Sequence, residues 1–327
     1  MMIRTRREFL QSFALLPLAG FGSSVARGDE KWPSRPVRLM VGFAPGGGVD
    51  AMARVVGSKL AQRLGHPVIV ENKTGATGTI CSEYVVRSAP DGYTLQLAHL
   101  SSNVLGPLVL ARGKFHPVED FTPIALLGAS PQVLVHHPRH RFRSVAELIA
   151  YARQNPGRLS FASSGIGGSQ HLAGEDFKRR AGVDLLHVPF KGTSEAIAAV
   201  LSGEVDMTFT SLSGAVPQWK SGKLAVLAVC APKRIAVMPD IPAMAETLEG
   251  FEMSTWTGLA GPKRLPGVIV ERLSLEMVAV LKLPEVVKRF DDLDMIVIAG
   301  GPREFGQFWR AEVTRYESLI REVKVQS

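Results

Sequence analysis

Cysteine is nearly absent from this chain of 327 residues, which contains only Cys81 and Cys230. A small secreted fold held together by several disulfides is therefore excluded. The two cysteines stand far apart among apolar or small residues, so a disulfide between them and two buried free thiols both stay open. Neither the cysteines nor the eight histidines show the spacing of metal ligands, and the sequence predicts no metal site.

Long apolar runs are absent as well. The apolar run near the N-terminus, residues 12–22, is well short of the roughly 20 residues that a membrane span needs. It follows the paired Arg6 and Arg7 and precedes small residues that end at Ala26. This order is typical of a twin-arginine-like export signal with a small-residue cleavage site. The sequence thus predicts export to the periplasm, removal of residues 1–26 and no membrane span in the mature chain.

Clustered positive charge is the third absence. The chain has 38 Lys and Arg against 30 Asp and Glu, a formal net charge of +8, but only residues 136–143 are locally basic. Nucleic-acid binding needs a basic stripe with aromatic platforms, and aromatic residues make up only 7% of the chain. The sequence therefore excludes a nucleic-acid partner, whereas the modest positive excess favours a small anionic one.

Short β-rich runs alternate with helical patterns from Trp32 onward. The expected strands cover residues 37–43, 68–70, 94–98, 124–127, 133–136, 159–162, 185–188, 205–209, 224–229 and 257–260. Helical patterns lie between many of them, such as residues 145–154 and 194–202. This alternation is typical of α/β proteins whose parallel strands are covered on both faces, and the length suggests about two domains.

Three consecutive glycines, residues 46–48, join the first expected strand to a helical pattern that ends at Gly65, a plausible C-cap. Asp50 is expected to be the N-cap of this helix. A helix N-terminus presents free N–H groups and the positive end of the helix dipole, and glycine lets an anion approach the backbone closely. We call residues 43–48 the first turn.

Two kinds of nucleotide site use a glycine-rich turn of this sort. No lysine follows the glycines, which excludes a P-loop. A dinucleotide site stays open as an alternative, because Gly46, Gly48 and Ala51 have the required spacing and Glu71 closes the next strand where a ribose hydroxyl would need an acid. That alternative predicts an exported NAD(P)-dependent oxidoreductase, although no hydride-transfer constellation follows.

Three more small-residue turns each open a helix: residues 75–78 (the second turn), 163–169 (the third turn) and 191–194 (the fourth turn). Such turns gather at the carboxyl ends of strands in an α/β sheet, where ligands bind. A nucleotide fold needs one turn, whereas a cleft that grips a small anion from two sides can use all four. Each turn alone could also be a tight βα connection. With no Gly-x-Ser-x-Gly elbow, the sequence predicts a binding protein that needs no cofactor, not an enzyme.

The chain resembles the Bug-type receptors, the extracytoplasmic solute-binding component of tripartite tricarboxylate transporters. The resemblance spans the mature chain and rests on "WPSRPVRLMVGFAPGGGVD", "VIVENKTGATG", "SAPDGYTL", "PVEDFTPIALL", "SFASSGIGGSQHLAGEDFK", "VPFKGTSEAIAAVLSGEVDMTF" and "WTGLAGP". It implies a two-lobed periplasmic-binding-protein-like fold with a ligand cleft between the lobes. Lobe 1 would comprise residues 30–128 and 257–327, with the C-terminal helices packed on it, and lobe 2 residues 129–256.

The resemblance also implies a small organic carboxylate as ligand and membrane permease subunits as partners. The implied ligand contacts are Phe43, Ala44, Pro45, Gly46, Gly47, Ala76, Thr77, Gly78, Asn103, Ser163, Gly165, Gly168, Ser169, His171, Lys191, Gly192, Thr193 and Asp206. The stretch "SSNVLGP" departs from the His-Ala-Ile-Asn-Pro-like segment of the family and leaves the ligand's identity open. For Asp206 the alternative is a structural acceptor for loop amides, and for His171 it is a residue that caps its own turn.

Overall fold

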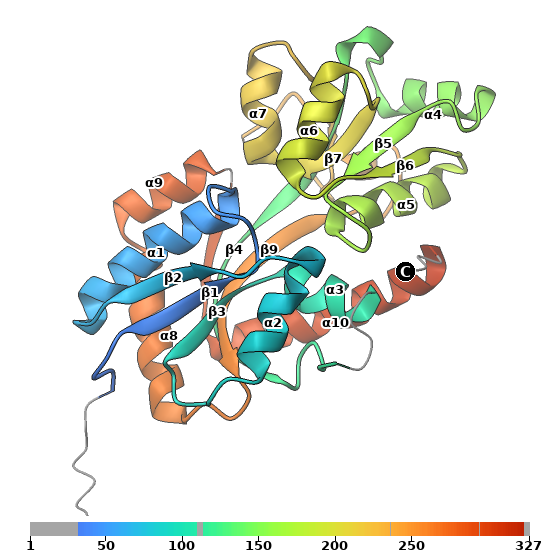
Figure 1. The fold of residues 1–327 in the computed structure, drawn as a ribbon. Coiled ribbons are helices and arrows are strands. Elements are labelled where there is room, and N and C mark those ends of the chain that lie inside the picture. The colour runs from blue at the N-terminus through green and yellow to red at the C-terminus, as the bar shows by residue number, and fades with distance from the viewer. Residues whose placement is uncertain (1–31, 110–113, 236, 294, 324–327) are drawn as a thin grey trace, which may run out of the picture. The chain divides into compact units, whose positions relative to one another are not determined.

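The computed structural model describes residues 32–109, 114–235, 237–293 and 295–323, which form an α/β fold (Figure 1). The expected export signal lies outside these residues. Within the described ranges, no helix combines the length and the apolar character that crossing a membrane requires.

A mixed sheet organises the chain after Trp32. Its strand order is β2-β1-β3-β9-β4-β7-β5-β6, and β8 and β10 also pair with β4. The strands are β1 (Val37–Val41), β2 (Val68–Asn72), β3 (Thr94–His99), β4 (Phe121–His136), β5 (Ser160–Ser163), β6 (Leu186–Pro189), β7 (Met207–Ser211), β8 (Ala225–Val229), β9 (Ser254–Pro262) and β10 (Ile296–Gly300). The expected parallel pairing joins β1 to β2 and β3, and β5 to β6 and β7. The ladders of β4 and β9 are antiparallel, so the sheet is mixed, which the alternation of strands and helices did not predict.

Strand β4 belongs to both ends of the sheet. Its first part, as far as Pro131, pairs with β9, whereas the part from Gln132 to His136 pairs with β7 (Figure 1). The sequence predicted two strands here, but the chain stays extended through Pro131, which has no N–H to donate and lies where the partner strand changes. One long strand therefore links the elements around β1 to the elements around β5.

The helices follow the expected alternation. They are α1 (Gly48–Leu64), α2 (Thr79–Val86), α3 (Gly106–Val109), α4 (Val145–Gln154), α5 (Ser169–Ala181), α6 (Thr193–Ser202), α7 (Leu212–Lys220), α8 (Gly267–Leu281), α9 (Pro284–Asp292) and α10 (Pro302–Val323). The prediction of Asp50 as the N-cap of α1 was wrong. Gly47 occupies that position, and Asp50 is the third residue of the helix. Gly65, with φ 72°, is the C-cap as expected.

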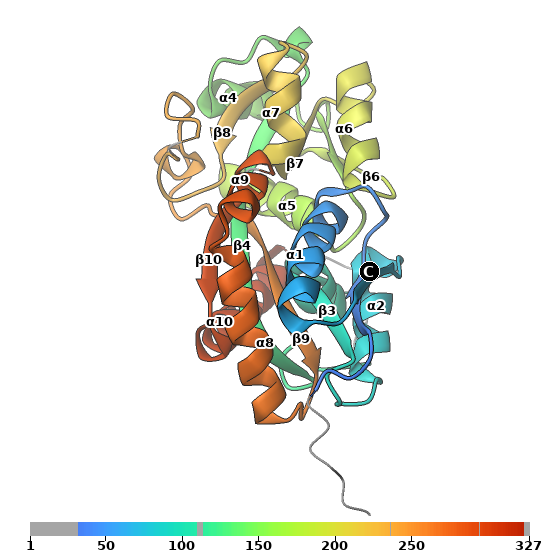
Figure 2. The ribbon, with the colours of Figure 1, turned by 90° about the vertical axis from the view of Figure 1, so that its left-hand side faces the viewer.

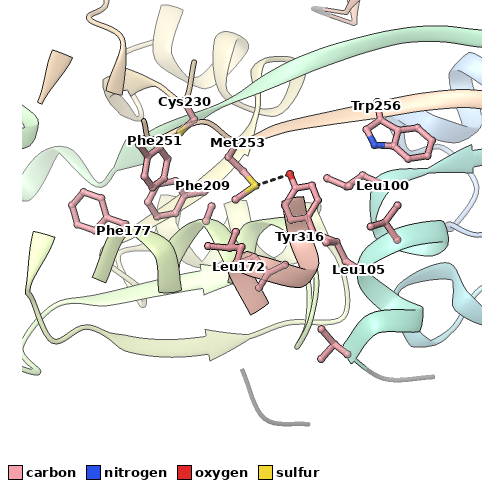
Figure 3. Close-up of a cluster of buried hydrophobic side chains, with 14 of the residues drawn as sticks. Leu100, Leu105, Leu172, Phe177, Phe209, Cys230, Phe251, Met253, Trp256 and Tyr316 are labelled. Atoms are coloured by element: carbon pink, nitrogen blue, oxygen red, sulfur yellow. Dashed lines mark hydrogen bonds between the residues drawn. The ribbon is translucent and has the colours of Figure 1, made fainter. Parts of the chain in front are cut away.

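The three C-terminal helices pack differently. Helices α8 and α9 lie beside α1 and β10 (Figure 2), whereas α10 packs against β4 and also against α5. Tyr316 of α10 is fully buried and its hydroxyl lies 3.2 Å from the sulfur of Met253 (Figure 3). The same hydrophobic cluster contains Leu105 and Leu172, so one buried core joins the two ends of the sheet.

Candidate functional site

All four turns follow the carboxyl end of a parallel strand. The first and second turns follow β1 and β2, which are neighbours, and the third and fourth follow β5 and β6, which are also neighbours. Because parallel neighbours end at the same edge, each pair of turns is adjacent. The first pair belongs to one end of the strand order and the second pair to the other.

The two pairs of turns meet at Thr77. A Cβ placed on Gly165 would lie 3.8 Å from the Thr77 methyl carbon, and a Cβ placed on Gly168 would lie 4.0 Å from it. The Gly165 position would also lie 3.6 Å from the carbonyl oxygen of Phe190, just before the fourth turn. The structure thus brings the second, third and fourth turns together, although they come from opposite ends of the sheet.

The first turn adjoins the second and exposes its backbone. A Cβ placed on Gly42 would lie 2.9 Å from the Cα of Gly78. Residues 44–48 are exposed, and a Cβ placed on Gly46 or Gly48 would meet no atom within 4 Å. The first turn therefore presents open backbone at the start of α1, where a ligand could reach it.

The buried carboxylate of Asp50 holds the first turn through hydrogen bonds. Asp50 accepts hydrogen bonds from the backbone N–H of Gly46 at 2.9 Å and from Asn72 at 2.8 Å, and it pairs with Arg54 at 2.9 Å. The hydrogen bond from Arg54 is the main cause that lowers the pKa of Asp50 to about 2. Asn72 also donates to the carbonyl oxygen of Phe43. Asp50 thus fixes the conformation of the first turn, and its negative charge is balanced by Arg54.

The second turn has an unusual backbone. Ala76 and Thr77 both have positive φ, 47° and 53°, which non-glycine residues seldom adopt. Strained conformations of this kind often cluster at ligand-binding sites. Gly78 has φ 92°, and a Cβ there would lie 2.7 Å from the Cβ of Ser102, so this position accepts only glycine.

Two stacked histidines lie behind the third turn. The rings of His171 and His187 are 4.0 Å apart, and His187 Nε2 forms a 2.6 Å hydrogen bond with the Ser163 hydroxyl. His171 Nδ1 accepts the backbone N–H of Gly167 at 3.1 Å. Burial is the main cause that lowers the pKa of His171 to about 3 and that of His187 to about 4. Both rings are therefore neutral near pH 7, and Nδ1 of His171 is engaged in holding its own turn.

The fourth turn is more open. Lys191 is exposed, and its backbone N–H donates to Glu195 at 3.2 Å. Gly192 is the N-cap of α6, which begins at Thr193, and a Cβ on Gly192 would meet no atom within 4 Å. This turn therefore offers a second exposed helix N-terminus with a cation beside it.

Asn103 does not reach the turns. Its side chain is fully buried, where its oxygen accepts from the Ser102 hydroxyl at 2.6 Å and its nitrogen donates to Gln96 at 3.1 Å. These bonds fix the π-helical turn at Ser101–Leu105. The Asn103 amide is thus used within the fold, and we leave it out of the candidate site.

Asp206 also lies apart from the turns. It precedes β7 at the level of Ser160, so it stands at the amino ends of the parallel strands, whereas the turns stand at the carboxyl ends. Its carboxylate accepts from the backbone N–H and the hydroxyl of Ser160 at 2.7 and 2.8 Å, and pairs with Arg139 and His140. The geometry agrees with the structural alternative, an acceptor for loop amides.

Glu71, the acid that a dinucleotide site would need, is already paired with Arg38. Both of its oxygens accept from the Arg38 guanidinium, at 2.7 and 2.6 Å. A ribose hydroxyl would have to displace this bidentate pair. None of the contacts of the first turn supports the oxidoreductase alternative.

Cys81 and Cys230 could have formed a disulfide or remained free. Both are buried free thiols.

Gln132 is one of the polar residues beside the turns that were not predicted, together with Asn72 and His187. Gln132 of β4 is 1% exposed, and its Nε2 donates to the hydroxyl of Ser169 at 2.9 Å, at the start of α5. Its Oε1 is buried and has no hydrogen-bond partner. A glutamine inside the apolar run "PQVLVH" was the available sequence signal.

Comparisons with known proteins show which family the chain belongs to. A family model described as "Tripartite tricarboxylate transporter family receptor" matches residues 52–325. The chain is 35% identical to the "UPF0065 protein in tcbD-tcbE intergenic region" of Pseudomonas sp. (strain P51), over 98% of this chain and 96% of that protein. It is 31% identical to Protein BugT of Bordetella pertussis, over 93% of each chain.

Solved structures resemble the chain over almost their full length. Rpa4515 of R. palustris, solved with adipate, has a TM-score of 0.84 and 29% identity, covering 90% of this chain and 99% of that one. MatC (Rpa3494) from Rhodopseudomonas palustris, solved with bound malate, has a TM-score of 0.81 and 32% identity, covering 88% and 99%.

The fold is therefore the α/β fold of periplasmic binding proteins, as expected. More specifically, the chain belongs to the receptor family of the tripartite tricarboxylate transporters, which confirms the Bug-type resemblance. It is a solute-binding receptor, and no finding supports an oxidoreductase.

Proposed function

We propose that this receptor captures a small organic carboxylate with the backbone amides of the four turns. The observation that supports the proposal is the proximity of Thr77 to the third turn, since a Cβ built on Gly165 or Gly168 would lie 3.8 or 4.0 Å from its methyl carbon. Four helices, α1, α2, α5 and α6, begin at these turns. Residues 43–49, 75–79, 163–170 and 190–194 contain no Asp or Glu, and the adjoining carboxylates of Asp50 and Glu195 already accept N–H groups of the turns.

The relatives support the choice of ligand class. Rpa4515 was solved with adipate and MatC with malate, and both ligands are small dicarboxylates. The proposed contacts in this chain are the first, second, third and fourth turns, with His171 and Asp50 as residues that hold their turns in place. Asn103 and Asp206 are not among the proposed contacts.

We further propose a two-lobed receptor that closes on its ligand. Residues 30–128 with 257–327 would form one lobe and residues 129–256 the other, because β4 changes its partner strand between Pro131 and Gln132. Hinge closure around a ligand is a common behaviour of periplasmic binding proteins. After cleavage near Ala26, the exported receptor would deliver its ligand to the permease subunits of a tripartite transporter without catalysing a reaction on it.

A thermal-shift screen tests the proposal. The panel comprises malate, succinate, adipate, citrate, aromatic acids, amino acids and the nicotinamide cofactors. A true ligand at about 100 times its dissociation constant should stabilise the native protein by about 2.7 kcal/mol. The corresponding amide, malamide for malate, should give almost none of this gain because it lacks the negative charge. Stabilisation by NADH but by no carboxylate would overturn the proposal.

A further inference from the structure

We propose that Gln132 selects for a hydroxyl group on the ligand, so that the receptor prefers a hydroxycarboxylate to the same acid without the hydroxyl. This inference rests on the proposed function, since it concerns how the same site distinguishes carboxylates. It begins from the unpartnered oxygen of Gln132, which is buried at the edge of the third turn.

The position of Gln132 is fixed from both sides. Its backbone N–H donates to Met253 and its carbonyl oxygen accepts from Cys230, so the strand cannot easily shift. In the β4–β7 ladder it pairs with Ser211, the last residue of β7, at the carboxyl end of that strand. The side chain reaches the first residue of α5 through its bond to Ser169. The amide group therefore lies where the third turn enters its helix.

The two ends of this amide would offer complementary groups to a ligand that reaches them when the proposed lobes open. Because the Ser169 hydroxyl accepts a bond from Gln132, its own hydrogen stays available to donate to a carboxylate oxygen. Oε1 of Gln132 can only accept, and a buried acceptor without a donor is costly. A ligand that satisfies both groups needs a carboxylate and, close to it, a hydrogen-bond donor.

The charge around the turn decides which donor fits. A hydroxyl and an ammonium group both donate, but an ammonium group would face the positive end of the α5 dipole and the nearby Lys191 turn. The third and fourth turns contain no acidic residue, and the Glu195 carboxylate beside the fourth turn already accepts the Lys191 N–H. A neutral hydroxyl meets no such repulsion, so the geometry favours a hydroxycarboxylate over an amino acid.

The test compares ligands that differ by one hydroxyl: malate with succinate, lactate with propionate, and citrate with tricarballylate. Dissociation constants are measured by titration calorimetry for the wild type and for Gln132→Met, which keeps the length of the side chain but has no polar atom. In the wild type, the hydroxylated member of the best-bound pair should bind at least about tenfold more tightly. In Gln132→Met this ratio should fall to about twofold or less, with the affinity for the unsubstituted acid nearly unchanged.

Thr208→Val is the matched control. Thr208 is also fully buried, on the neighbouring strand β7, but its hydroxyl donates to the carbonyl oxygen of Ala162 and not to the third turn. This variant should keep the wild-type ratio. Equal binding of both members of each pair by the wild type, or an unchanged ratio in Gln132→Met, would overturn the inference while leaving the carboxylate receptor intact. Failure of every carboxylate to bind would instead overturn the proposed function, and this inference with it.

Discussion

Individual glycines of the turns serve different purposes. Gly46 has φ 83°, so its own backbone requires glycine. Gly47 has φ −76° and ψ 168°, an extended conformation that any residue adopts, and a Cβ there would meet only the carbonyl oxygen of Ala44 at 3.6 Å. The fold therefore does not need glycine at position 47. A bare backbone there is what the proposed ligand contact would require.

Gly47→Val should consequently fold normally and bind its carboxylate at least about tenfold more weakly, because the branched side chain covers the amides that begin α1. Titration calorimetry with the best ligand of the screen measures the loss. Gly267→Val is the matched control, because Gly267 is an exposed glycine at the first position of α8 and has nothing within 4 Å. Wild-type affinity in a folded Gly47→Val protein would mean that the first turn is only a βα connection.

At the scale of elements, the third turn and helix α5 form a unit that depends on neutral histidines. Nδ1 of His171 can accept the Gly167 N–H only while it carries no proton. The rings of His171 and His187 stack at 4.0 Å, so two protonated rings would repel each other. Glu175 lies 3.9 Å from Nε2 of His171, and Lys178 pairs with the same carboxylate.

Acid should destabilise the protein for this reason. The pKa of His171 falls to about 3 in the folded state, against about 6.5 in an unfolded chain. As the pH falls below about 6.5, the unfolded state takes up protons that the folded state excludes, so the free energy of unfolding should decrease steadily down to about pH 4. Urea denaturation at pH 7.5, 5.5 and 4.5 measures this slope.

His171→Asn separates this cause from others. Its side-chain oxygen can accept the Gly167 N–H in place of Nδ1 but does not titrate, so the slope should become shallower. It should not vanish, because burial also lowers the pKa of His99 to about 4. An unchanged slope in His171→Asn would show that the acid sensitivity arises elsewhere.

The limits of sequence reasoning also appear at this scale. Buried strands such as β1 and β3 were predictable because their apolar runs are bounded by turn residues. Strand β10 was missed: it is short and exposes Ile296 and Ile298, and only its pairing with β4 makes it a strand. The start of α1 was misplaced because Asp50 supports the turn from inside the helix.

The site residues also divide into those that a local pattern predicts and those that depend on tertiary contacts. The four turns could be predicted because a strand, small residues and a helix follow one another locally in the sequence. The surroundings of Asn103, Asp206 and Gln132 could not, since they depend on burial and on partners that the fold brings from other segments. Local patterns thus identify where a ligand can bind, whereas tertiary contacts decide which polar side chains are free to touch it.

At the scale of the whole chain after Trp32, two strands and one helix link the parts that carry the turns. Strand β4 pairs with β9 and then with β7, and α10 packs against both β4 and α5. The first and second turns come before these links in the sequence, and the third and fourth come between β4 and β9. A ligand held by both pairs of turns would therefore tie together the two proposed lobes.

A crystal structure with the best carboxylate of the screen tests this account most directly. The account predicts one ligand between the two pairs of turns. Its carboxylate oxygens should lie about 2.7–3.2 Å from backbone nitrogens of the first turn and of the start of α5, and its hydroxyl should lie within the same range of Gln132 Oε1. A carboxylate bound elsewhere, for instance in the recess lined by Lys73, Tyr84 and Arg87, would contradict the account.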